Sequence, residues 1–151
     1  GQYPMFATVS FVGSTAFSNE LVNVQNISEE HYNNIIVTQV VPSPFSTMLQ
    51  AAVDYRSLKR KYFPAENFNY VAFEGFLNAK VMVEALRNTE CNISRSSFRH
   101  AFYKIKNWDV GIDQKVNFST TRHQGFDQIY FSRLTPEQRF ETFNVEGKDT
   151  Q

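Results

Sequence analysis

The sequence predicts an α/β fold, because two strand patterns with a short helix between them open the chain and three helical patterns follow before strands return. Of the 151 residues, 42% are hydrophobic, which is enough for a buried core. Only two strands precede the long helical block, so the helices lack enough sheet to cover them. We therefore expect another segment, or another chain, to complete the core.

The amino-terminal part predicts a strand, a helix and a second strand. Residues 4–12 alternate in a strand pattern that ends at Gly13. A short helix over 14–22 is expected next, with Ser14 as its N-cap. The β-branched run over 35–41 predicts a strand buried on both faces, as in a sheet covered by helices.

Three helices are predicted after this strand, over 45–63, 69–88 and 94–105. The first has helical spacing in Met48, Ala52, Val53 and Tyr55, and Ser94 should cap the third. The second should be heavily buried through an apolar stripe at three- and four-residue steps, formed by Ala72, Phe76, Ala79, Val83 and Leu86. Beyond these helices, short strands over 115–118, 125–134 and 139–144 are expected to pair as hairpins.

Composition excludes several classes of function. Fifteen basic residues balance fifteen acidic ones, so the chain has no net charge with which to hold nucleic acid. A single cysteine excludes an internal disulfide and a thiolate zinc cluster, and the three histidines are scattered, so we predict no metal and no cofactor. No apolar run approaches the roughly 20 residues of a membrane-spanning helix. No catalytic constellation is recognisable, which predicts a protein that is not an enzyme.

Three segments together resemble the type I periplasmic solute-binding proteins of branched-chain amino acid ABC transporters. They are a strand with a proline exit (Val37-Thr38-Gln39-Val40-Val41-Pro42), a helix (Phe73-Glu74-Gly75-Phe76, Ala79-Lys80-Val81, Glu84-Ala85-Leu86-Arg87) and a later segment (His123-Gln124-Gly125, Gln128-Ile129-Tyr130). The spacing from Ser94 to Phe98 is similar to a helix start of the same family. The resemblance covers nearly the whole chain.

The resemblance implies part of a fold with two Rossmann-like lobes that close on a solute. The C-terminal portion of that fold is expected here, incomplete without most strands of the first lobe. Its expected parts are second-lobe strand, helix and strand (1–39), a hinge crossing (40–45), first-lobe helices (46–110), a second crossing (111–118) and second-lobe strands (119–151). We also expect the chain to self-associate, because the first-lobe helices would otherwise stay uncovered.

The function implied by the resemblance is a periplasmic or extracellular receptor that captures a small solute and presents it to an ABC permease. An alternative is the extracellular sensor of a transmembrane signalling protein, in which closure drives a fused signalling domain. A third is a cytoplasmic regulator built on the same fold. A transmembrane helix encoded in the full gene would favour the sensor over the transport receptor. A full gene that encodes no signal sequence would favour the cytoplasmic regulator.

Two groups of residues are predicted to contact the solute. Amino-acid binders of the family commonly hold the ligand ammonium with an acidic residue after the strand that matches Phe6 to Val9, but this chain has Ser10, followed by Phe11, and then Ser14. Without a carboxylate, a zwitterionic ligand is disfavoured and a neutral, aromatic or carboxylate solute is favoured. The alternative is that these serines only cap the next helix.

The second group lies at the start of the long helix, whose N-terminal end faces the ligand in the family. Tyr70 and Phe73 could stack on the solute, and unpaired backbone N–H groups nearby could hold an anion. The alternative is that Phe73 only packs in the hydrophobic core and does not contact the solute. Glu74 is either a support for the site or a favourable charge in the first turn of the helix.

Overall fold

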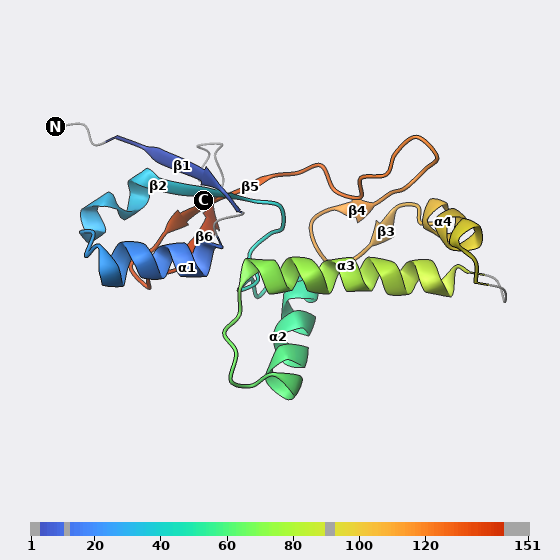
Figure 1. Cartoon of the computed structure of the whole chain (residues 1–151), viewed down its shortest axis with the longest axis horizontal. Helices are drawn as coiled ribbons and strands as arrows, with labels where there is room; N and C mark the ends of the chain where they lie inside the picture. Colours follow the sequence, from blue (N-terminus) through green and yellow to red (C-terminus); the bar gives the residue numbers. More distant parts are fainter. Residues whose placement is uncertain (1–3, 11–12, 90–92, 144–151) are drawn as a thin grey trace. The chain divides into compact units, whose positions relative to one another are not determined.

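The computed structural model describes residues 4–10, 13–89 and 93–143, and the chain divides into two compact units. Unit 1 consists of Gly1–Ser43, Asn69–Val71 and Ile129–Gln151. Unit 2 consists of Pro44–Phe68 and Ala72–Gln128. The elements follow the predicted order of strand, helix, strand, three helices and strands (Figure 1), which confirms the α/β prediction.

A four-stranded sheet in the order β1-β2-β5-β6 forms the centre of unit 1. Its strands are β1 (Phe6–Val9), β2 (Ile35–Gln39), β5 (Tyr130–Leu134) and β6 (Phe140–Phe143). β1 and β2 are parallel, whereas β5 is antiparallel to both of its neighbours. The two early strands and the last hairpin are therefore confirmed, each shorter than predicted.

Helix α1 (Ser14–Asn19) connects β1 to β2, and it continues as a π-helical turn (Glu20–Val24) before a 3-10 turn (Glu29–Asn34). The prediction of Ser14 as N-cap is wrong, because the helix begins at Ser14 and its N-cap is Gly13, at φ 68°. The carbonyl of Gly13 accepts a hydrogen bond from the Phe17 N–H at 3.0 Å, so the first turn closes through the backbone. Phe17 in turn stacks on Phe140 of β6 with ring centroids 5.9 Å apart, so α1 packs on the sheet.

Strand β2 is buried on one face. Ile35, Val37 and Gln39 are buried, whereas Ile36 and Thr38, which alternate to the other face, are only half-buried. The prediction that both faces are buried is therefore wrong for the second face. The described residues leave that face partly open, which is unusual for a strand with so many β-branched side chains.

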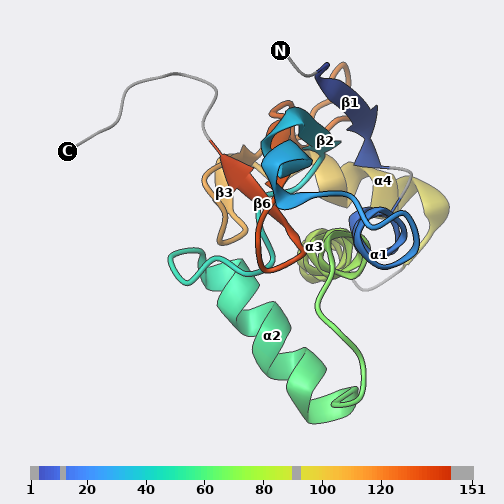
Figure 2. The same cartoon turned by 90° about the vertical axis from the view of Figure 1, so that its left-hand side faces the viewer.

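Unit 2 combines three helices with a two-stranded ribbon. The helices are α2 (Gln50–Tyr62), α3 (Tyr70–Arg87) and α4 (Arg95–Tyr103), and the ribbon pairs β3 (Trp108–Asp109) with β4 (Lys115–Val116). Figure 2 shows α2 running away from α3. Of the predicted carboxy-terminal strands, 115–118 shortens to β4, and 125–134 forms a strand only from Tyr130.

The predicted cap of the third helix is confirmed. Ser94 is the N-cap of α4, and its Oγ accepts the N–H of Ser97 at 3.0 Å. The Ser97 Oγ accepts the Ser94 N–H at 2.8 Å in return, so the two residues form a capping box.

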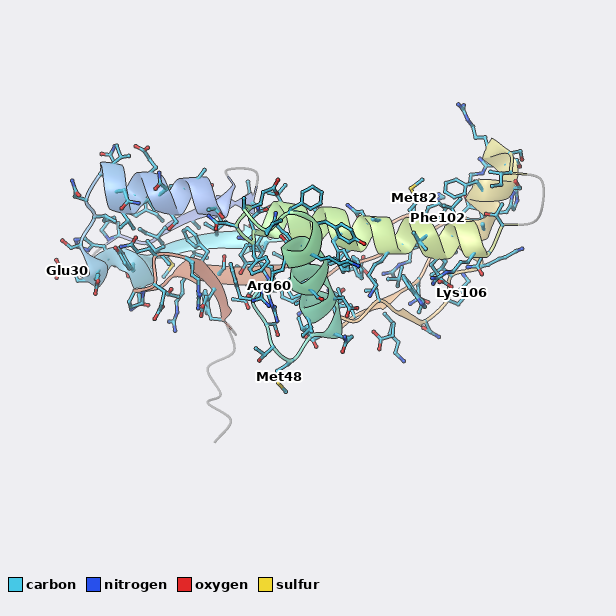
Figure 3. The ribbon with its side chains drawn as sticks, turned by 90° about the horizontal axis from the view of Figure 1, so that it is seen from below. Glu30, Met48, Arg60, Met82, Phe102 and Lys106 are labelled. Carbon is cyan, nitrogen blue, oxygen red and sulfur yellow. The ribbon has the colours of Figure 1, made fainter. Side chains whose placement is uncertain are left out.

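Two predictions for the helices are wrong, one on where α2 begins and one on which face of α3 is buried. Met48, predicted to lie in the first helix, lies in the loop before it and is 90% exposed, because α2 begins only at Gln50 (Figure 3). In α3 the predicted stripe is not the buried one: Val83 is 45% and Leu86 41% exposed. The buried stripe lies on the opposite side of the helix and consists of Phe73, Leu77, Val81 and Ala85. Because α3 is apolar on two faces, periodicity could not tell which one the described residues cover.

Candidate functional site

The carboxyl ends of β1 and β2 lie at the same edge of the unit 1 sheet, because the two strands are parallel. Ligands of open α/β sheets bind outside the carboxyl ends of such strands. Val9 is paired with Thr38, so Ser10 and Gln39 are the next positions along the two strands. This edge is the candidate binding region of unit 1.

The structure brings two predicted site residues into one turn at this edge. Ser10 is half-buried, and its carbonyl accepts the Gly13 N–H at 3.1 Å. Ser14 follows as the first residue of α1 and is 7% exposed. Phe11 lies outside the described residues. Contact of these residues with a solute stays a prediction.

Gln39 and Ser132 form a buried polar pair beside this edge, which the sequence reasoning missed. Gln39 is 1% and Ser132 0% exposed, and the Gln39 Nε2 donates to the Ser132 Oγ at 3.2 Å. The Ser132 hydroxyl donates in turn to the carbonyl of Val37 at 2.8 Å. One signal was available: Gln39 is in phase with Ile35 and Val37 along the strand and so shares their buried face.

Tyr70 is held inside unit 1. Its side chain is 5% exposed, and its hydroxyl donates a hydrogen bond to the Phe140 carbonyl at 3.1 Å. Burial raises the pKa of the Tyr70 phenol far above its ordinary value, and a hydrogen bond with Ser43 offsets part of that shift. This geometry gives Tyr70 a packing role in unit 1, and its stacking on a solute stays a prediction.

The raised pKa of Tyr70 makes the stability of unit 1 sensitive to alkaline pH. The pKa is higher in the folded state than the unfolded value of 10.0, so the stabilisation is present below pH 10 and is lost as pH rises above it. We expect the free energy of unfolding to fall by up to about 1.4 kcal/mol per pH unit from this group. Urea unfolding followed by circular dichroism at pH 9 and pH 11 measures the loss.

The Tyr70→Phe variant should lose less stability than the native chain over this pH interval. The matched control is Tyr62→Phe, at a position that is 60% exposed, and it should keep the native dependence. Equal pH dependence in the native chain and in Tyr70→Phe would contradict a buried, neutral phenol.

Phe73 and Glu74 belong to unit 2 and sit one turn into α3. Phe73 is 0% exposed, and its ring packs against Tyr55 and Phe76 at centroid distances of 5.2 and 6.4 Å. Glu74 is half-buried. The structure therefore gives Phe73 a place in the unit 2 core, whereas the predicted contacts of both residues with a solute stay predictions.

Two hollows lie away from the predicted residues. One, of about 240 Å³, is at the amino ends of β1 and β2 in unit 1 and is lined by Pro4, Phe6, Ile27, His31, Asn34 and Ile35. The other, of about 380 Å³, lies between α2 and α3 in unit 2. Among the described residues, no group of three or more His, Cys, Asp or Glu side chains is placed to hold a metal ion. Nor is any helix in residues 4–10, 13–89 and 93–143 long and apolar enough to cross a membrane.

Comparison with known proteins finds its matches among solved structures. No protein-family model and no curated protein matches the sequence. A possible leucine/isoleucine/valine-binding protein from Rhodopirellula baltica is similar with a TM-score of 0.81 and 26% identity over 94% of this chain. A substrate-binding periplasmic protein from Ralstonia solanacearum (TM-score 0.74, 20% identity) and an extracellular ligand-binding receptor from Verminephrobacter eiseniae (0.71, 17%) match over 95% and 90% of this chain.

The match is to part of each of these structures. This chain spans 36%, 39% and 37% of the Rhodopirellula, Ralstonia and Verminephrobacter chains. The resemblance found in the sequence motifs is thereby confirmed. The chain has part of the fold of the type I periplasmic solute-binding proteins.

Proposed function

We propose that this chain is part of a periplasmic or extracellular receptor that captures a small solute between two hinged lobes and presents it to an ABC-type permease. The similarity to the Rhodopirellula binding protein over 94% of this chain carries the proposal. The division into two compact units also supports it, since the chain passes between them more than once. In such a receptor a solute that contacts both lobes stabilises the closed state, which the permease recognises. The reaction class is binding, with no chemical change.

The hinge proposal is supported most clearly for residues 40–45. The chain leaves unit 1 after Ser43 and enters unit 2 at Pro44. The Arg56 guanidinium donates to the carbonyls of Pro44 and Ser46 at 2.6 and 2.8 Å, so α2 holds the segment just after this passage. Such fixed contacts next to the connection between the two units suit a hinge, because they confine the change in backbone conformation to a few residues. The crossing proposed at 111–118 has no such support, since unit 2 extends to Gln128.

The proposed solute is a neutral, aromatic or carboxylate molecule without a free ammonium group. Ser10 follows β1 at the carboxyl edge, and Gln39 beside it is neutral and engaged with Ser132. Hydroxyl and amide groups hydrogen-bond a neutral or anionic solute but do not neutralise an ammonium group. An aromatic solute, a small carboxylate, or an amino acid-like solute without a charged amino group fits this edge.

Ser10→Asp should shift this selectivity. In the completed receptor we expect the variant to bind leucine at least about tenfold more tightly, because a charge-assisted hydrogen bond to the ammonium contributes about 1.5–3 kcal/mol. It should bind the deaminated carboxylate analogue of leucine more weakly. Titration calorimetry with both solutes measures the change, and Ser96→Asp, at an exposed position of α4, adds the same charge away from the edge as a control. Equal affinities in Ser10→Asp and the native chain would exclude Ser10 from the site.

A sensor domain is the second candidate. The Verminephrobacter structure is described as an extracellular ligand-binding receptor, a description that suits a signalling protein as well as a transporter. The two functions share solute capture and differ in what reads the closed state. A transmembrane helix followed by a kinase or cyclase domain in the full gene would favour the sensor, and a neighbouring permease gene would favour transport.

Native mass spectrometry of the receptor purified from its own source tests the shared proposal. A small molecule that co-purifies in a 1:1 ratio and is released on unfolding is the expected result. Absence of any bound small molecule, together with no binding in a screen of amino acids, carboxylates and aromatic solutes, would contradict solute capture.

A further inference from the structure

The segment around α4 concentrates positive charge in a chain that has no net charge. Residues 93–106 contain four basic residues and no acidic one, whereas the whole chain balances fifteen of each. We call residues 93–106 the α4 basic segment, and its cations are Arg95, Arg99, Lys104 and Lys106. All four of these residues are exposed. A net charge of zero therefore does not exclude a positive surface, because a partner responds to the charges nearest its contact.

The apolar side of α4 is packed inside unit 2. Ala101 is 1% and Ile105 2% exposed. The Phe102 ring packs edge-on against Phe98 and Phe118, with centroid distances of 5.1 and 5.5 Å. Because these contacts fix the apolar side against unit 2, the helix presents its charged side to solvent.

Arg95 and Arg99 lie on the same side of α4 at an i, i+4 spacing. Like charges at this spacing destabilise a helix, and a positive charge in the first turn, such as Arg95, also opposes the helix dipole. Within residues 4–10, 13–89 and 93–143, neither guanidinium has an ion pair or a hydrogen bond. The two arginines therefore lower the stability of α4 with no compensating contact to a described residue, which favours a role in binding an anionic partner.

Other exposed arginines of unit 2 have an anion of their own. Arg87 is paired with Glu84 at 3.4 Å, and Arg122 is paired with Asp127. Their charges are therefore compensated within the same unit. The arginines of α4 differ from them in this respect, so the uncompensated charge is a local property of α4.

A phospholipid surface with anionic headgroups fits the α4 basic segment. Ile93, directly before the helix, is 70% exposed and can enter the boundary between headgroups and acyl chains. At the other end of the segment, the Lys106 ammonium donates to the Phe118 carbonyl, a neutral acceptor that leaves the charge of the lysine in place. Positive side chains spaced along a surface, with an apolar side chain among them, are typical of proteins that bind anionic lipids.

We propose that the α4 basic segment docks the receptor on the anionic phospholipids of a membrane surface. The inference rests on the proposed function, because a receptor that serves a permease works beside the bilayer in which the permease is embedded. Electrostatic attraction to that surface raises the local concentration of the receptor and the rate at which it meets its permease. The contact is peripheral and reversible, since the apolar side of α4 stays packed in unit 2.

Co-sedimentation with vesicles tests the docking without any solute. The whole receptor is mixed with vesicles of phosphatidylcholine alone, and with vesicles of phosphatidylcholine and phosphatidylglycerol in equal parts. We expect binding to the anionic vesicles only, and loss of most of it when the salt concentration rises from about 0.05 M to about 0.5 M, because salt screens exposed charges. Equal binding to both kinds of vesicle would contradict an electrostatic contact.

The double variant Arg95→Gln with Arg99→Gln should bind the anionic vesicles about 30-fold more weakly, because each arginine near such a surface contributes about fivefold to the affinity. Glutamine forms helices about as well as arginine, and the substitutions remove the like-charge pair, so urea unfolding should show no loss of stability. The matched control is Arg60→Gln with Lys61→Gln, which removes two charges from exposed positions of α2. Figure 3 shows Arg60 well away from Phe102 of α4, and this control should bind like the native receptor.

Two further results would overturn the inference. A native receptor that binds neither kind of vesicle would exclude a lipid partner, and weaker binding of the α4 double variant to the detergent-solubilised permease would then make an acidic protein surface the partner. Equal losses in the α4 and α2 double variants would make the attraction a property of overall charge rather than of α4. Neither result bears on solute capture, which is measured separately by mass spectrometry of the native receptor.

Discussion

Replacing Phe73 with alanine should lower the free energy of unfolding of unit 2 by about 3–5 kcal/mol. The Phe73 side chain is 0% exposed, and its ring packs against Tyr55 of α2 and Phe76 of α3. Truncation removes this contact between the helices and leaves a cavity that the surrounding residues fill only in part. A loss of this size is a large part of the stability of a domain, so we expect unit 2 of the variant to unfold at a much lower urea concentration than the native unit.

Tryptophan fluorescence measures this effect in unit 2 alone, since the chain has one tryptophan and Trp108 lies in β3. Urea unfolding of the native chain and of Phe73→Ala gives the difference. Met82→Ala is the matched control, because Met82 is on the same helix, opposite the buried stripe, and is 51% exposed. A loss below about 1 kcal/mol in Phe73→Ala would exclude Phe73 from the core and would favour its predicted contact with a solute.

Gly111→Ala is expected to destabilise unit 2 by about 2–4 kcal/mol, since two effects add. Gly111 has φ +94°, a conformation in which a side chain is strained. An added Cβ would also lie 2.9 Å from the Ala51 nitrogen, at the start of α2. That nitrogen donates to the Gly111 carbonyl at 2.9 Å, so relief of the clash breaks a hydrogen bond that caps the helix.

Gly75→Ala provides the contrast for this prediction. Gly75 lies inside α3 with open space around it, so alanine there should stabilise the isolated chain by about 0.5–1 kcal/mol. Both variants are measured by urea unfolding with Trp108 fluorescence. If Gly111→Ala and Gly75→Ala changed stability equally, the close approach of Gly111 to α2 would be wrong.

The order of elements could be predicted from the sequence because each segment carries its own local signal. The β-branched run at β2, the Ser94 capping box and the helical spacing of α3 are all properties of neighbouring residues. The ends of the elements were less predictable. Met48 belongs to a loop because α2 begins at Gln50, a boundary that depends on how the chain leaves β2 rather than on periodicity.

Burial could not be predicted in the same way, because it depends on residues distant in sequence. The apolar stripe through Ala79 and Val83 and the stripe through Leu77 and Val81 have the same period, and only packing in unit 2 selects the second. The polar pair of Gln39 and Ser132 depends equally on the antiparallel pairing of β2 with β5, far along the chain. Of the candidate site, the sequence predicted the turn after β1, but not the buried amide beside it.

We propose that this chain supplies only part of a solute site, and one calorimetric experiment tests this proposal most directly. A panel of amino acids, carboxylates and aromatic solutes is titrated into this chain alone and into the whole receptor purified from its own source. We predict saturable 1:1 binding by the whole receptor, and no binding by this chain alone at solute concentrations up to about 1 mM. Tight, saturable binding to this chain alone would contradict it.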